Sequence, residues 1–117
     1  MKLPYEALLL RILIGESDRV DGKPLYKVIV DEAREQGLAG ATVLRGILGF
    51  GGSSRIHTSR VLRLSEDLPI VIEIVDTAEK IEAFLPLLDG MIDEGLVTLE
   101  KARIIAYRYR KDEKEDD

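Results

Sequence analysis

Donor groups for an anion gather in one stretch of this chain, residues 36–65. These residues include no Asp or Glu, although the chain has 22 acidic residues and a net charge of −5. Six of the ten glycines lie between Gly37 and Gly52, and Arg45, Arg55, Arg60 and Arg63 give the stretch a formal charge of +4. Backbone N–H groups at glycines, hydroxyls and guanidinium groups are donors that proteins use for phosphate. The stretch therefore predicts an anion-binding site.

The candidate phosphate ligands lie at the end of an expected strand and in the loop after it. They are Arg45, Gly46, Gly49, Phe50, Gly51, Gly52, Ser53, Ser54, Arg55 and His57. The segment is not a P-loop, because it lacks Gly-Lys-Ser/Thr and is followed by a strand pattern rather than a helix. The ring of Phe50 suits base stacking as well as packing. His57, the single histidine, suits a ligand contact better than catalysis. The alternative of a hairpin tip whose basic side chains offset an acidic surface stays open.

Composition bounds the class of protein. With 117 residues, 45% hydrophobic and 33% charged, we expect one globular domain at 1–110 and a charged, disordered tail at 111–117. The absence of cysteine excludes disulfides, cysteine zinc sites and thiol catalysis. A pI near 5.0 argues against nucleic-acid binding. No apolar run suits a membrane span and the N-terminus is a poor signal peptide, so a cytoplasmic location is expected. The lack of Asn fits a thermophilic source as well as chance.

Apolar periodicity predicts a β-α-β-β-α-β order of the main elements. Strands are expected at 7–15, 41–50, 60–64, 68–75 and 102–109, with a polar loop at 16–23. One helix begins near Pro24 and ends at Gly37. A second begins at Asp76, with Glu79 completing a capping box, and runs to residue 95, kinked or shortened by Pro86. This order predicts an α+β, ferredoxin-like fold with both helices on one face of an antiparallel sheet.

The sheet face that the helices leave uncovered is also expected to be apolar. Leu9, Leu13, Val71 and Val75 fall on that face, and only Arg11 and Glu73 interrupt it. An apolar face of this size is unusual on a monomer. We therefore expect it to be buried against copies of the same chain.

Three motifs in order resemble those of the PII signal-transduction proteins. They are G-L-A-G-A-T-V at 37–43 followed by G-F-G at 49–51, L-P-I-V-I-E-I-V-D at 68–76, and A-Y-R-Y-R at 106–110. Together with the helices between them they span nearly the whole chain. The fuller pattern from residue 8 to residue 51 is most similar to an uncharacterised branch of small PII-like proteins, grouped as a domain of unknown function.

The resemblance implies a homotrimer of ferredoxin-like chains with the sheets facing inward. It implies an adenine nucleotide, ADP or ATP, with or without Mg²⁺, in clefts between subunits. Thr42 matches the family's threonine near the adenine, and Arg108 and Arg110 match arginines near the phosphates. The loop at 50–65 corresponds to one that contacts a partner protein, in the family a membrane transporter, a channel or an enzyme. Such proteins are regulators rather than enzymes.

This sequence also departs from the PII pattern. The family's glycine-rich, lysine-containing phosphate loop before the last strand is replaced by an acidic segment at 89–103, and the loop at 51–68 has no tyrosine for modification. Glu16, Asp18 and Asp21 suit either Mg²⁺ or a solvated turn. Two other functions remain: an oligomeric docking module without a small ligand, and a small phosphate-handling enzyme. The chain has no Asn of the kind that acylphosphatases use and no evident nucleophile–base pair.

Overall fold

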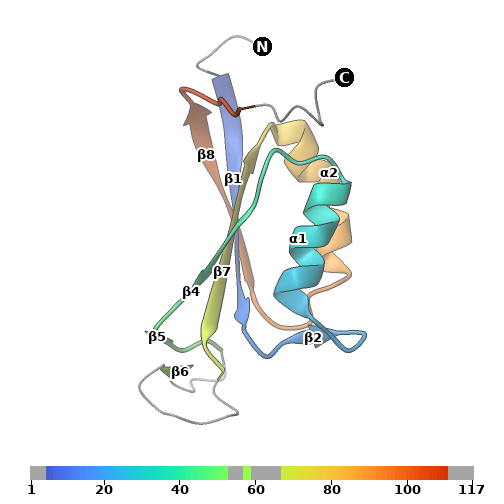
Figure 1. Cartoon of the computed structure of the whole chain (residues 1–117), viewed down its shortest axis with the longest axis vertical. Helices are drawn as coiled ribbons and strands as arrows, with labels where there is room; N and C mark the ends of the chain where they lie inside the picture. Colours follow the sequence, from blue (N-terminus) through green and yellow to red (C-terminus); the bar gives the residue numbers. More distant parts are fainter. Residues whose placement is uncertain (1–4, 53–56, 59–66, 111–117) are drawn as a thin grey trace.

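A four-stranded antiparallel sheet forms the centre of the computed structural model, which describes residues 5–52, 57–58 and 67–110, the pair 57–58 by its backbone alone. The strand order is β4-β7-β1-β8, with β1 at Tyr5–Gly15, β4 at Thr42–Arg45, β7 at Pro69–Asp76 and β8 at Leu96–Ile104. Helices α1 (Leu25–Glu35) and α2 (Ala78–Asp89) both lie on one side of this sheet (Figure 1). The predicted α+β, ferredoxin-like fold is confirmed.

The core lies between the sheet and the two helices. Alternate residues of β1 and β7 point toward the helices, as the two-residue period of a strand requires. Each of these strand residues is at most 6% exposed: Leu10, Ile12, Ile14, Ile70, Ile72 and Ile74. They pack against Ile29 of α1 and against Ile81, Phe84 and Leu88 of α2. The apolar residues predicted from strand alternation and from helical spacing therefore form one core.

Helix α1 begins and ends close to the predicted residues. Pro24 lies one residue before its start rather than inside its first turn. At the other end Gly37 has a φ of 80°, and its N–H donates to Arg34 O at 3.1 Å. The N–H of Leu38 donates to Ala33 O at 3.1 Å. This pair of bonds is the Schellman arrangement, in which glycine supplies the left-handed residue.

The predicted bounds of α2 were wrong at both ends. Thr77 is the N-cap, and its hydroxyl accepts a hydrogen bond from the N–H of Lys80 at 3.3 Å, so Asp76 is free for another contact. The helix includes Pro86 but ends at Asp89 rather than at residue 95. Met91 and Ile92 still pack on the core from the turn that follows, so apolar spacing continued after the helix had ended.

Strand bounds also differ from the predicted ones. The strand expected at 41–50 divides into β4 and a short β5 (Leu48–Gly49), which pairs with β6 (His57–Thr58). The chain turns at Gly46, whose N–H donates to Pro69 O at 2.7 Å. The last strand is β8, which ends at Ile104, the residue paired with Tyr5, and not at residue 109. The expected strand at 60–64 and the tail at 111–117 lie outside the described residues.

The segment expected as a plain polar loop contains a small hairpin. Strand β2 (Arg19–Val20) pairs with β3 (Lys23–Pro24) across a two-residue turn. Asp21 and Gly22 have φ values of 50° and 78°. Asp-Gly is the pair that such tight turns favour, because both residues take positive φ.

No helix within the described ranges is long and apolar enough to cross a membrane.

Candidate functional site

The sheet face opposite the helices, here called the open face, is organised in rows. Directly paired residues share a face, so the strand register defines each row. One apolar row crosses all four strands and consists of Leu96, Leu13, Val71 and Leu44. Its outer members are 55% and 49% exposed for Leu96 and Leu44. The predicted apolar open face is present, and in a single chain it is only partly covered.

The next row of the open face is polar. Arg11 lies at its centre and donates hydrogen bonds to carboxylate oxygens of Glu73 and Glu100, each at 2.9 Å. The hydrogen bond to Glu73, with the charges of both glutamates, raises the pKa of Arg11. The guanidinium is therefore charged at neutral pH, and it pairs with two carboxylates on this face.

A cleft of about 480 Å³ opens at the end of this face where β1 begins and β7 ends. Its walls are the start of β1, the end of β7, residues 39–42 before and at the start of β4, and the chain after β8. The residues that line it include Tyr5, Leu9, Thr42, Glu73, Val75, Ile104 and Tyr107. Apolar walls with a few polar groups, at this volume, are typical of small-molecule sites.

The segment that brings Thr42 to the cleft is held by three side chains from other elements. The carboxylate of Asp76 accepts the N–H of Ala39 at 2.8 Å. The hydroxyl of Tyr107 donates to Ala39 O at 3.3 Å, and Lys80 Nζ donates to Gly37 O at 3.3 Å. These ties connect the end of α1, the start of α2 and the chain after β8 at one place.

The structure divides the predicted phosphate ligands into two groups. Thr42 points to the open face opposite Glu73, whereas Arg45 pairs with Ile70 and points to the helix face. At about 3.3 Å per residue the two lie about 10 Å apart along β4. Arg45 donates to the carboxylate of Glu16 in the 16–23 segment. Within one chain, therefore, Thr42 and Arg45 do not converge on a single ligand.

Two of the predicted glycines have a packing reason of their own. A Cβ on Gly46 would lie 2.7 Å from Pro69 Cγ, and one on Gly49 would lie 3.2 Å from it. Gly51 and Gly52 have open space around them, and Phe50 is 71% exposed. Ser53, Ser54, Arg55 and the side chain of His57 lie outside the described part of the chain.

The C-terminal arginines follow the cleft wall. Arg108 and Arg110 are exposed and lie one and three residues after Tyr107, whose ring is 5.6 Å from that of Tyr109. These arginines therefore come directly after the cleft wall that Ala106 and Tyr107 form. The sequence analysis did not identify Glu73, Val75 or Tyr107 as cleft residues, although all three lie inside the motifs it used.

Two of the acidic candidates for Mg²⁺ make contacts within the protein instead. Glu16 pairs with Arg45, and a carboxylate oxygen of Asp18 accepts the N–H of Gly15 at 3.0 Å. Across residues 5–52 and 67–110, no three metal-ligating side chains come together. These contacts favour the solvated turn over the metal site.

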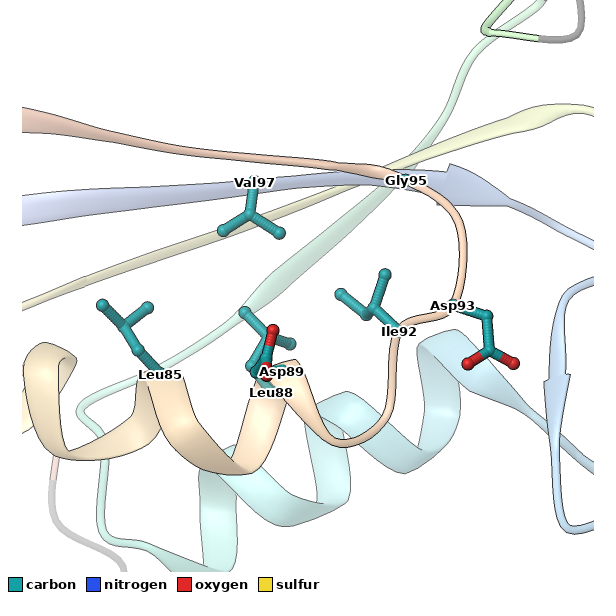
Figure 2. A pocket seen from close by; sticks show the side chains of 7 residues that line it. All are labelled: Leu85, Leu88, Asp89, Ile92, Asp93, Gly95 and Val97. Carbon is teal, nitrogen blue, oxygen red and sulfur yellow. The ribbon is translucent and has the colours of Figure 1, made fainter.

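A second hollow, of about 380 Å³, lies between α2 and β8 (Figure 2). Leu85, Ile92 and Val97 point into it, and its charged lining residues are Asp89 and Asp93. The turn after α2 is where the PII pattern would place its lysine-containing phosphate loop. Carboxylates repel phosphate, so this hollow is a poor phosphate site in this chain.

Residues 7–104 match the model of the DUF190 family, described as "Uncharacterized ACR, COG1993". A UPF0166 protein of Aquifex aeolicus (strain VF5) is 43% identical over 97 residues, which cover 83% of this chain and 91% of that protein. A UPF0166 protein of Methanocaldococcus jannaschii is 35% identical over 100 residues, covering 85% and 92%.

Solved structures of PII-like proteins have the same fold. CPII, a nitrogen regulatory PII-like protein from Thiomonas intermedia K12 bound to ADP, AMP and bicarbonate, superposes with a TM-score of 0.60 at 19% identity, over 87% of this chain and 91% of that one. A PII-like protein of Thermus thermophilus gives 0.63 at 18% identity, over 86% and 90%. The resemblance drawn from the motifs is thus confirmed for the fold, and the chain belongs to the DUF190 (UPF0166) family.

Proposed function

We propose that this protein is a non-catalytic, trimeric regulator that binds an adenine nucleotide, ADP or ATP, in the cleft at Thr42. The cleft itself is the observation that carries the proposal. It places Thr42 opposite the chain that leads to Arg108 and Arg110, the residues that the PII resemblance assigns to the adenine and the phosphates. CPII shares the fold at 19% identity, and its complex with ADP and AMP supports the same ligand class.

Assembly through the open face would complete the site. The apolar row is the part of this face that a copy would cover, since burying each such side chain stabilises a contact by about 1.5–3 kcal/mol. In the trimer the two groups of ligands, which do not converge within one chain, would come from neighbouring copies. Thr42, Ala106 and Tyr107 would hold the base. Arg108, Arg110 and a neighbour's donors after β4 would approach the phosphates.

The partner surface is the hairpin that follows β4. Ile47, Leu48 and Phe50 are 75%, 63% and 71% exposed there, beside glycines with open space around them. Exposed apolar side chains grouped on a hairpin are typical of a protein contact. Nucleotide bound in the cleft of one chain would approach the hairpin of a neighbouring copy. It would thereby bias the conformations of the loop at 50–65 and report the ligand to a partner, a membrane transporter or channel in the PII-like family.

Calorimetric titration of the wild-type protein with ATP, ADP, AMP and cyclic AMP, with and without Mg²⁺, tests the ligand. Saturable binding of about one nucleotide per chain is expected. The titration also compares nucleotides that carry one, two and three phosphates. An absence of heat with all four ligands would contradict nucleotide sensing.

A docking module that binds no small molecule is the second candidate. The packing of Gly46 and Gly49 on Pro69 favours it, because it explains two of the glycines without a ligand. The basic stretch at 36–65, which includes the exposed apolar hairpin, would then dock an acidic partner directly. Partner binding that falls with salt and ignores nucleotide would support this candidate against the first.

The non-catalytic part of the proposal has its own test. Catalysis on phosphate needs a nucleophile with a base beside it, or a metal. The described cleft residues offer three hydroxyls, from Tyr5, Thr42 and Tyr107, and two carboxylates. Glu73 is already bonded to Arg11, and Asp76 to the N–H groups of Ala39 and Thr77. Hydrolysis of ATP or of an acyl phosphate well above the buffer rate would contradict the proposal and favour the enzyme.

A further inference from the structure

Asp76 is the charged side chain that the described structure buries most fully, at 6% exposure. It is the last residue of β7. One carboxylate oxygen accepts the N–H of Ala39 at 2.8 Å, and the other accepts the N–H of Thr77 at 2.6 Å. A buried carboxylate is costly unless such bonds compensate for the lost water. The sequence assigned this residue to a helix cap, but Thr77 caps α2.

The contact with Ala39 is the one that connects distant parts of the chain. The two residues are 37 positions apart, and Ala39 is the first of residues 39–42, which line the cleft and lead into β4. The other backbone group of Ala39, its carbonyl oxygen, accepts a hydrogen bond from Tyr107 at 3.3 Å. Both peptide groups at Ala39 are thus held by side chains, which determines the direction in which residues 39–42 enter the cleft.

We propose that Asp76 is a positioning residue for the ligand site: its carboxylate holds residues 39–42 in the conformation that the ligand requires. The ligand would be the adenine nucleotide, so the inference rests on the proposed function. Asp76 also borders the cleft, but it is 6% exposed and each of its oxygens already accepts an N–H, so its main action on the site is through the backbone of Ala39.

The test compares Asp76→Asn with a matched control, Asp67→Asn. Both substitutions preserve shape and replace one acceptor oxygen by a donor. Asp67 lies before the other end of β7, and its carboxylate accepts the N–H of Ser17 at 2.7 Å, in a loop that does not line the cleft. Calorimetry with ADP is expected to show at least about tenfold weaker binding for Asp76→Asn, and wild-type binding for Asp67→Asn.

Amide hydrogen exchange supplies a second readout that needs no ligand. Asp76→Asn should speed exchange at Ala39 and its neighbours while amides in the middle of β1 and β7 stay protected. Asp67→Asn should leave Ala39 unchanged. If Asp76→Asn fails to fold, Lys80→Met replaces it, because Lys80 is exposed and holds the same segment at Gly37 from outside the cleft. That variant should fold and weaken ADP binding by about twofold.

The results separate this inference from the proposed function. Equal ADP affinity in Asp76→Asn and wild type, or equal weakening in both Asn variants, would overturn the positioning role. If wild-type protein gives no heat with ADP, the proposed function is refuted. An adenine nucleotide is then not the ligand of the site that Asp76 positions. The exchange experiment would then decide the remaining claim: unchanged exchange at Ala39 in Asp76→Asn would overturn it, and local loss of protection would uphold it.

Discussion

The apolar row on the open face gives a prediction about assembly. Leu13 lies in the middle of this row, paired with Leu96 on one side and Val71 on the other. We expect Leu13→Asp to dissociate the trimer while each chain remains folded. In a separate chain the new carboxylate reaches water from a half-buried position, so the cost to folding should stay within about 1–2 kcal/mol.

The cost to the assembly is much larger. When a copy covers the row, the substitution removes about 1.5–3 kcal/mol of apolar burial. It also buries a carboxylate without a partner, which costs several kcal/mol. A total of at least about 4 kcal/mol per chain, or about 12 kcal/mol for three chains, would raise the dissociation constant by about nine orders of magnitude.

Sedimentation velocity at micromolar concentration measures this effect directly, with circular dichroism to show that the variant is folded. Leu87→Asp is the matched control, because Leu87 is 40% exposed on α2, in the helix layer rather than on the open face. We expect wild type and Leu87→Asp to sediment as trimers and Leu13→Asp as a monomer. A monomeric wild type, or a Leu13→Asp protein that remains trimeric, would show that the apolar row is not the contact between subunits.

Two further predictions concern the cleft and the turn after β4. Thr42→Val removes one hydroxyl from an exposed strand position, so it should weaken ADP binding by about two- to tenfold in calorimetry and leave the melting temperature unchanged. An unchanged affinity would remove Thr42 from the site. Gly46→Ala should lower the free energy of unfolding by about 1–3 kcal/mol in urea, because its Cβ would lie 2.7 Å from the ring of Pro69. The control Gly51→Ala, with open space around it, should change stability by less than about 0.5 kcal/mol, and equal stabilities would contradict the packing reason.

The parts of the fold that follow from local patterns were predictable from the sequence. The alternation in β1 and β7 placed the core and the open face, and Gly37 marked the end of α1. The bounds of β8 were not predictable in this way. They depend on the register with β1, which ends at the pair of Tyr5 with Ile104. The strand at 102–109 was predicted from its apolar spacing alone, which gives no information on how it pairs with β1.

The candidate site was predictable to a smaller extent. The resemblance to PII proteins identified Thr42, and the structure places it in a cleft. The roles of Asp76 and Tyr107 depend on hydrogen bonds to Ala39 across 37 and 68 residues, for which a local pattern gives no signal. The pairing of Arg45 with Glu16 is non-local as well, across 29 residues. Sequence spacing grouped Arg45 with Thr42, whereas strand geometry places them on opposite faces.

Photoaffinity labelling with 8-azido-ADP, followed by peptide mapping, would locate the bound base. We expect the adduct on residues 39–45 or on residues 104–110, and excess ADP should prevent its formation. Labelling on the peptide that carries Asp89 and Asp93, or labelling that ADP does not prevent, would contradict a nucleotide site at Thr42.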